Sequence, residues 1–393
     1  LMKKIPYGRQ NIDKNDIDKV IDVLTSDFLT QGPLVGNFES KICEMFSPKH
    51  SIAVNSATSA LHIACMALGI NENDTVWTSP NSFVASANCA LYCGAKVDFV
   101  DIDLKTGLIS IEKLIKKLDN AAALNKIPSL IIPVHLAGAS CDMDAISKLS
   151  QKYGFKIIED ASHAVGGKYK GNYVGSCEYS DITVFSFHPV KIITTAEGGV
   201  ATTNRKDYAD KLYKLRSHGI EKNHENFYLP TDKPWVYEQQ LLGYNYRMSD
   251  VHAALGISQL KKLDKFVAER NEIIRRYKEL FHDMNFFSFL EVQDDVYSSF
   301  HLAVIILNGD AISFHKDIFK FLRESNIGVQ VHYIPIHCQP YYKKLGFKKG
   351  DFPNAEEYAN RAISIPIYPG LSHENQKYIF NIFKKVQNYF NLT

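Results

Sequence analysis

The chain has 393 residues, of which 45% are hydrophobic and 22% charged, and its formal net charge is +2. This composition is typical of a globular protein of roughly two domains, and the lack of blocks of like charge argues against binding to nucleic acid or an anionic membrane. No apolar run approaches the ~20 residues of a membrane span, and residues 1–6 lack the apolar core of a signal peptide. With seven scattered cysteines and no CxxC pair, the sequence predicts a soluble cytoplasmic protein with reduced thiols.

Through the first two-thirds of the chain, short apolar runs alternate with amphipathic stretches. This alternation predicts an α/β fold with a mostly parallel sheet and helices on both faces. Seven strands are expected, at residues 51–54, 75–79, 96–100, 130–134, 156–159, 182–187 and 199–203. The clearest helices are expected at residues 57–68, where apolar residues recur every three or four positions, and at 143–153, which Asp142 would cap.

After Ser249 the pattern changes to that of a smaller α+β domain. Helices are expected at residues 250–260, 265–284 and 375–389, and strands at 300–306 and 328–333. We therefore predict a large domain over residues 1–250, which would bind a cofactor, and a small domain over residues 251–393.

One acidic residue ends an apolar strand. Asp160 closes the run at 156–159, which places it at the carboxyl edge of the sheet, where α/β sheets bind ligands. An ordinary helix cap is the alternative, because aspartate is a favoured capping residue.

A lysine lies between two strand-like runs. Lys191 follows the apolar strand at 182–187 and precedes a second apolar stretch at 192–200. Most lysines are solvated, but burial among neutral groups would lower the pKa of this amine and free it for Schiff-base chemistry. The pair Gly198-Gly199 would allow another part of the backbone to approach closely.

The small hydroxyl residues at 55–61 join a strand to the start of a helix. Unpaired N–H groups and the helix dipole make such a start a ready phosphate site, although ordinary Ser/Thr capping explains it equally well. His332, His337 and Cys338 lie within seven residues, which raises a metal site as an alternative. Their spacing fits no standard zinc pattern, so we expect no metal site and interpret the histidines, with His188, as polar lining for a sugar or pyrophosphate.

These segments resemble the DegT/DnrJ/EryC1/StrS family of sugar aminotransferases, which have the fold-type-I architecture of pyridoxal 5'-phosphate (PLP) enzymes. The motifs that carry the resemblance lie at residues 28–33, 56–61, 159–164, 185–191 and 243–248. Within the family, residues 188–195, 238–245 and 330–336 are most similar to the transaminases of pseudaminic acid biosynthesis.

The resemblance implies a role for each matching residue. Lys191 would bind PLP covalently as a Schiff base, and Asp160 would pair with the pyridinium nitrogen. His163 would lie near the ring hydroxyl and Phe83 would stack on the ring, although each is also consistent with core packing. The residues expected to hold the phosphate are Ala57, Thr58, Ser186 and, reaching from the second subunit of a homodimer, Asn245, which is otherwise a turn residue. The residues expected to contact substrate are His188, Arg247, His332 and Tyr333.

The implied reaction is transfer of an amino group from L-glutamate to the C4 keto group of a UDP-linked 4-keto-6-deoxy-N-acetylhexosamine. The product would be a UDP-4-amino-sugar for pseudaminic acid biosynthesis. The alternatives are an aminotransferase for another nucleotide sugar, dTDP- or GDP-linked and aminated at C3 or C4, a PLP-dependent dehydratase, and a non-catalytic regulatory homologue. Dehydratases of this family carry histidine at the lysine position, so Lys191 argues against that reaction.

Overall fold

The computed structural model describes residues 4–392 and is built around a seven-stranded sheet of order β1-β9-β8-β5-β4-β2-β3. Every strand runs in the same direction except β9, which is antiparallel to both of its neighbours. The strands are β1 (His50–Val54), β2 (Thr75–Thr78), β3 (Lys96–Phe99), β4 (Leu130–Ile132), β5 (Lys156–Asp160), β8 (Ile182–Ser186) and β9 (Gly199–Thr203). The seven predicted strands and the α/β fold class are thereby confirmed.

Helices cover both faces of this sheet. The helices on one face are α3 (Ala57–Ala67), α4 (Ala85–Tyr92) and α7 (Lys206–Arg216). Those on the other are α2 (Pro33–Phe46), α5 (Ile111–Ala123), α6 (Met143–Tyr153) and α8 (Asp250–Leu260). The two-residue period of a strand explains the division, because Leu130 and Ile132 pack in the first layer while Ile131 between them packs in the second.

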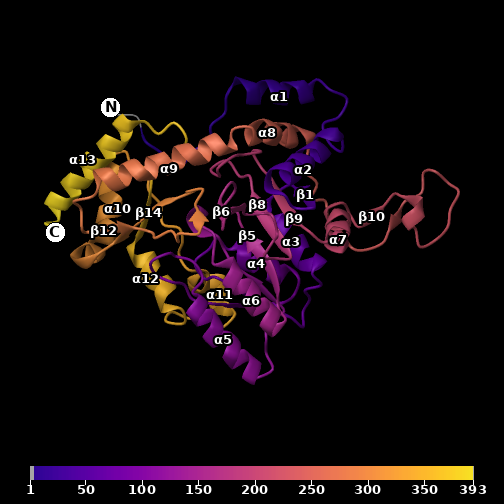
Figure 1. The fold of residues 1–393 in the computed structure, drawn as a ribbon, viewed down its shortest axis with the longest axis horizontal. Helices are drawn as coiled ribbons and strands as arrows, with labels where there is room; N and C mark the ends of the chain where they lie inside the picture. The colour runs from indigo at the N-terminus through magenta and orange to yellow at the C-terminus, as the bar shows by residue number, and fades with distance from the viewer. Residues whose placement is uncertain (1–3, 393) are drawn as a thin grey trace.

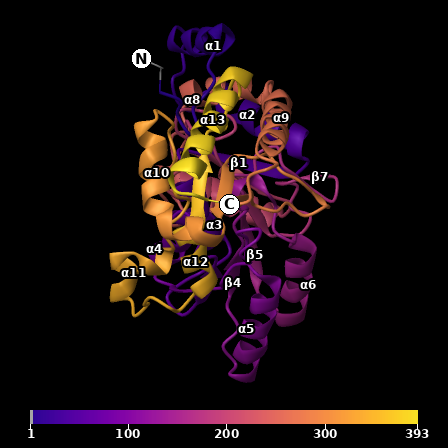
Figure 2. The same ribbon diagram turned by 90° about the vertical axis from the view of Figure 1, so that its left-hand side faces the viewer.

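The C-terminal third of the chain forms a second core beside the first. Its antiparallel sheet has the order β12 (Phe287–Phe289), β14 (Ala303–Leu307), β15 (Ala362–Ile365). The helices around it are α9 (Leu263–Leu280), α10 (His315–Glu324) and α13 (His373–Tyr389), and Figure 2 shows α13 facing the viewer with α10 to its left. Ile5, from the other end of the sequence, belongs to this core. The division at residue 250 stays a prediction.

Two smaller features lie outside these layers. Helix α1 (Lys14–Leu24) lies on α8, anchored by the buried Asp16, whose carboxylate accepts hydrogen bonds from Gln259 and Lys262. The strands β10 (Ile220–Glu221) and β11 (Glu238–Gln239) form the base of an arm that projects from the body (Figure 1). The arm carries strongly exposed apolar side chains, namely Tyr228, Leu229, Trp235 and Tyr237.

The remaining elements connect these parts. They are β6 (Lys168–Tyr169), β7 (Asn172–Tyr173), β13 (Val296–Tyr297), α11 (Pro340–Lys344), α12 (Pro353–Arg361) and the short 3-10 turns at Leu136–Gly138, His224–Asn226, Gly309–Phe314 and Ile336–Cys338. Within residues 4–392, no helix combines the length and apolar character needed to cross a membrane.

Two local predictions are wrong, and one predicted strand begins later than expected. The run at 192–198 is a loop whose apolar side chains are buried, and the strand begins at Gly199. The strand expected at 300–306 begins at Ala303, because Phe300 adopts a positive φ of 44°. Residues 328–333 form no strand and make only an isolated bridge between Gln330 and Ser364, because the chain then turns to direct His332 and Tyr333 toward the sheet edge.

Candidate active site

The carboxyl edge of the large sheet opens into a cavity of about 360 Å³. Strand β5 delivers Asp160 to it, β8 delivers Ser186, and the loop between β8 and β9 delivers Lys191. Parallel strands end at one edge, so residues far apart in the sequence converge there. The other lining residues used below are Tyr7, Ala57, Thr58, Ser82, Phe83, Ser162, His163, His188, Glu197, His301, His332 and Tyr333.

The loop that carries Lys191 is held at both ends and in the middle. Phe187 N–H donates to the carbonyl of Gly198 at 3.0 Å and closes the loop, while Lys191 N–H donates to the carbonyl of His188 at 2.9 Å. Ile192 and Ile193 are buried in the core next to it. The apolar pair that suggested a strand therefore anchors the loop instead.

The amine of Lys191 is tuned by its surroundings. The residue is half-buried because the cavity reaches it, yet protein surrounds it on the other sides. Burial lowers the pKa of the amine to about 8, although the charge of Asp160 opposes this shift. A substantial fraction of the amine is then neutral, and thus nucleophilic, near physiological pH.

Asp160 is buried and lines the same cavity as Lys191. Its Oδ1 accepts hydrogen bonds from the hydroxyl and the N–H of Ser162, and its Oδ2 accepts one from the hydroxyl of Ser86. The capping alternative is excluded by position, since no helix of the described chain begins at Asp160. A buried carboxylate facing a cavity is suited to pair with a protonated ring nitrogen.

Three histidines and a tyrosine form one wall. His163 accepts from the N–H of Ala137 at Nδ1 (3.3 Å), so its hydrogen lies on Nε2, which is 3.1 Å from the hydroxyl of Tyr333. Burial lowers the pKa of His163 well below its usual value and that of His332 to about 4. Burial also lowers the pKa of His301 well below its usual value, so the wall is neutral at physiological pH.

The start of α3 lines another side of the cavity. Ser56 caps the helix by accepting from the N–H of Ser59 at 3.1 Å, so the capping interpretation is correct for this residue. Ala57 and Thr58 nevertheless line the cavity with the first N–H groups of the helix, which have no partner within it. A Cβ on Gly199 would lie 2.5 Å from the amide nitrogen of Ala57, so glycine lets β9 lie directly against this helix start.

Phe83 and His188 lie at the mouth of the cavity. Phe83 is 58% exposed, which excludes the core-packing alternative, and its ring centroid lies 6.3 Å from that of Tyr333. His188 is exposed as well. An exposed aromatic ring beside a polar cavity is available for stacking on a planar ligand.

The chain matches the DegT/DnrJ/EryC1/StrS aminotransferase family over residues 10–384. It belongs to this family. It is 42% identical over 388 residues, 98% of each chain, to the UDP-4-amino-4,6-dideoxy-N-acetyl-beta-L-altrosamine transaminase of Campylobacter jejuni. The predicted family and the resemblance within it are confirmed.

Solved structures agree with this assignment. The Helicobacter pylori aminotransferase PseC, involved in the biosynthesis of pseudoaminic acid, matches with a TM-score of 0.90 and 32% identity over 98% of this chain and 100% of that one. The PLP form of the putative sugar aminotransferase Spr1654 from Streptococcus pneumoniae matches with a TM-score of 0.88 and 29% identity over 99% and 100% of the two chains.

Two predicted site residues of the aminotransferase lie outside the cavity of their own chain. Asn245 is exposed at the base of the arm, where it bridges to Ser217. Arg247 lies in a separate groove of about 880 Å³ between arm and body and donates to the hydroxyl of Ser217 at 3.1 Å. Neither residue lines the cavity that contains Lys191 in the same chain.

Other residues of the aminotransferase cavity escaped the sequence analysis. Ser162 follows Asp160 by two positions, a spacing at which an aspartate often bonds the backbone ahead of it. Ser82 lines the cavity just before α4, and its hydroxyl lies 2.7 Å from that of Ser86 in the first turn of the helix. Ser86 does not itself line the cavity but donates to Asp160, which does. Tyr7 and His301 had no local signal, because they reach the cavity from the second core.

The structure divides the histidine cluster between two places. His332 faces the cavity and pairs with Ser364, whereas His337, Cys338 and Glu356 meet elsewhere, with His337 Nε2 at 2.9 Å from Glu356 Oε1 and 3.4 Å from Cys338 Sγ. The ligand atoms of these three residues lie within 4.8 Å of one another, so the expectation of no metal stays a prediction.

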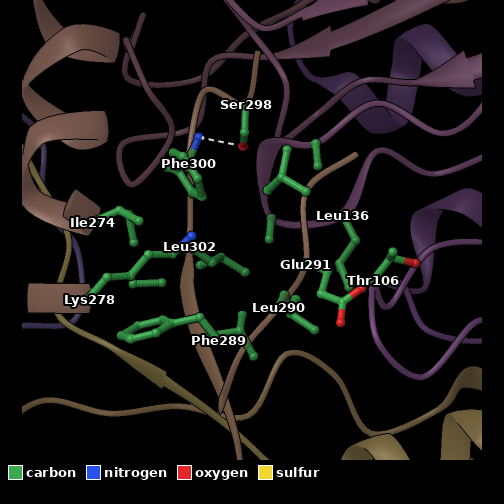
Figure 3. A pocket seen from close by; sticks show the side chains of 15 residues that line it. Thr106, Leu136, Ile274, Lys278, Phe289, Leu290, Glu291, Ser298, Phe300 and Leu302 are labelled. Carbon is green, nitrogen blue, oxygen red and sulfur yellow. Dashed lines mark hydrogen bonds between the residues drawn. The ribbon is translucent and has the colours of Figure 1, made fainter. Parts of the chain in front are cut away.

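Figure 3 shows a second, much smaller cavity behind the site. It has a volume of about 20 Å³ and is lined mainly by apolar side chains such as Leu136, Phe289 and Leu302. This is room for about one water molecule, too little for any substrate.

Proposed function

We propose that this aminotransferase moves an amino group from L-glutamate to the C4 keto group of a UDP-linked 4-keto-6-deoxy-N-acetylhexosamine, with PLP as its cofactor. The proposal rests on family membership and on the similarity to the C. jejuni transaminase across nearly the whole chain. The observation that carries the chemistry is a lysine with a lowered pKa in the same cavity as a buried carboxylate and a helix start.

The residues present fit PLP part by part. Lys191 would hold the cofactor covalently, Asp160 would pair with its ring nitrogen, and Phe83 would stack on the ring. His163 would hydrogen-bond near the ring hydroxyl. The phosphate would lie at the start of α3, where backbone N–H groups and the helix dipole favour an anion, with Ser186 beside it.

When bound, the cofactor acts as an electron sink that stabilises negative charge on the carbon bearing the amino group. Lys191, once free, accepts the proton of the glutamate α-carbon at Nζ, and later delivers a proton to the sugar carbon that receives the amine. An amine whose pKa lies near the working pH can move protons in both directions. The neutral wall of His163, His301 and His332 leaves Lys191 as the proton carrier in the cavity.

The site is proposed to be completed by a second subunit. Among the described residues, Lys191 is the one lysine or arginine that lines the cavity, although the proposed ligands carry several phosphate and carboxylate groups. We propose a homodimer in which the arm crosses to the partner, so that Asn245 holds the partner's cofactor phosphate and Arg247 contacts the partner's substrate. His188 would contact substrate in the cavity of its own chain. The exposed apolar side chains of the arm support this arrangement, since a buried interface would cover them.

A substrate panel tests the function directly. Purified protein is incubated with L-glutamate and either 4-keto or 3-keto nucleotide sugars bearing UDP, dTDP or GDP, and release of 2-oxoglutarate is followed. Turnover is expected with the UDP-linked 4-keto sugar. Amination of a dTDP- or GDP-linked sugar alone would replace the proposed substrate, and no turnover with any keto-sugar would reject the function.

A further inference from the structure

The carboxylate of Asp160 is surrounded by hydroxyl donors that come from two different elements. Ser86, in the first turn of α4, lies 2.6 Å from Oδ2, and Ser162, just after β5, lies 2.6 Å from Oδ1. The N–H of Ser162 also donates to Oδ1 at 3.1 Å. Ser86 and Asp160 are both buried, at 0% and 4% exposed, so water does not compete for these bonds.

The available acceptors determine the direction of each hydroxyl hydrogen bond next to Asp160. Ser86 has two acceptors within reach, the carbonyl of Phe83 at 3.3 Å and Oδ2 at 2.6 Å, and the shorter bond to the charged oxygen is the stronger. Because the hydrogen of Ser86 is used there, Ser82, at 2.7 Å, donates its own to the oxygen of Ser86. The chain of donors therefore runs from Ser82 through Ser86 to Asp160.

Counting acceptor positions shows where Asp160 remains open. An ionised carboxylate offers about four lone-pair positions, two on each oxygen. Ser162 occupies both positions on Oδ1, and Ser86 occupies one on Oδ2. The open position lies on Oδ2, and Asp160 lines the cavity.

We propose that Ser86, assisted by Ser162, is a positioning residue that holds Asp160 with the open lone pair of Oδ2 directed at the ring nitrogen of the cofactor. This inference rests on the proposed role of Asp160 toward PLP and adds the residues through which that role is set. The same turn of the chain also positions Phe83, whose ring is proposed to stack on the cofactor, since the N–H of Ser86 donates to the carbonyl of Phe83 at 3.3 Å. One turn thus orients two of the groups that would contact the ring.

The test is cofactor affinity in Ser86→Ala, measured by absorbance titration of the apoprotein. We expect the dissociation constant for PLP to rise about tenfold, as expected for loss of a hydrogen bond to a charged group. Ser51→Ala is the matched control, because Ser51 is equally a buried donor, to the carbonyl of Glu39 at 2.6 Å, but far from the cavity. It should leave the dissociation constant unchanged.

A cofactor analogue separates positioning from general structural damage. In 1-deaza-PLP a C–H group replaces the ring nitrogen, so the ring donates no hydrogen bond to the open position of Oδ2. Ser86→Ala should weaken binding of this analogue by less than about twofold, because the analogue lacks the hydrogen bond from the ring nitrogen to Asp160 that the substitution disturbs in PLP. Equal weakening of PLP and the analogue, or wild-type affinity for PLP, would overturn the proposal.

Two further results keep the outcome unambiguous. If Ser86→Ala does not fold, Ser162→Ala replaces it, since Ser162 is partly exposed and its N–H remains bonded to Oδ1. It should show a smaller loss of PLP affinity and the same insensitivity toward the analogue. If the wild-type protein binds no PLP, the proposed function itself fails, which is distinct from a wild-type protein that binds PLP but is indifferent to Ser86.

Discussion

Two opposing influences act on the amine of Lys191. Burial disfavours the charged ammonium, whereas the carboxylate of Asp160 favours it, and burial is the larger. At pH 7 the neutral fraction is roughly a few hundred times that of an ordinary lysine, because each unit of pKa is a factor of ten. The residue is therefore prepared for chemistry by its location and needs no neighbouring base to activate it.

The first prediction concerns pH. The rate at which apoprotein captures PLP should rise as pH increases and level off above pH 8, because the neutral amine is the nucleophile and its pKa is about 8. Stopped-flow absorbance over pH 6 to 10 measures this rate. A rate that continued to rise toward pH 10.5 would mean that Lys191 titrates as a solvated lysine.

The second prediction concerns Lys191→Ala. Transamination should fall by about 10³-fold, since both covalent attachment and proton transfer are lost. Release of 2-oxoglutarate measures this, and an unchanged circular dichroism spectrum shows that folding is intact. Lys168→Ala, at a half-buried lysine on β6 outside the cavity, is the control and should retain activity. A Lys191→Ala protein with wild-type turnover would contradict the mechanism.

At the scale of elements, the site depends on how closely β9 lies against α3. Gly199 begins β9, and the space for its Cβ is filled by the peptide between Ser56 and Ala57, at 2.5 Å from both the carbonyl carbon and the amide nitrogen. Backbone atoms cannot move aside as the end of a flexible side chain can. Any larger residue must displace the helix start that forms the proposed phosphate site.

The third prediction is that Gly199→Ala lowers PLP affinity by about tenfold or more, the consequence expected from overpacking a tightly packed position. Absorbance titration of the apoprotein measures this. Gly36→Ala is the matched control, because Gly36 lies in α2 with no atom within 4 Å of its added Cβ, and alanine favours a helix. Unchanged affinity in Gly199→Ala would place the phosphate elsewhere.

At the scale of the whole molecule, the cavity is closed by parts of the chain that are remote in sequence. The large sheet supplies Lys191 and Asp160, whereas Tyr7, His301 and Tyr333 come from the segments packed around the second core. The hydrogen bond between His163 and Tyr333 joins the two parts. By the proposed arrangement, a second subunit adds the remaining groups.

The fourth prediction tests that arrangement by complementation. Lys191→Ala and Asn245→Ala should each be nearly inactive alone, but a mixed dimer contains one site with both native residues. After subunit exchange, an equal mixture should regain about a quarter of wild-type activity, because half of the dimers are mixed and each has one intact site. If mass spectrometry showed exchange without recovered activity, Asn245 would not act across the interface.

Several parts of the site could be predicted from the sequence because their chemistry is local. Asp160 ends an apolar run, Lys191 lies in the loop that follows another, and Thr58 lies in the first turn of a periodic helix. Strand and helix patterns alone therefore placed these residues near the ends of elements. The failures have a physical cause as well. Ile192 and Ile193 form an apolar run in a loop, because tertiary burial rather than a strand ladder accounts for their hydrophobicity.

By itself, the sequence determined the α/β layers, the order of strands along the chain, and the family to which the protein belongs. Only the tertiary structure decided that Ser86 and Ser162 hold one carboxylate from two elements, that His163 bonds Tyr333, and that Asn245 is exposed and does not line its own chain's cavity. The reason is the separation of the contacting residues along the sequence. Hydrophobic periodicity is set by neighbours three or four residues apart, whereas these contacts join positions as many as 170 residues apart, which local pattern cannot encode.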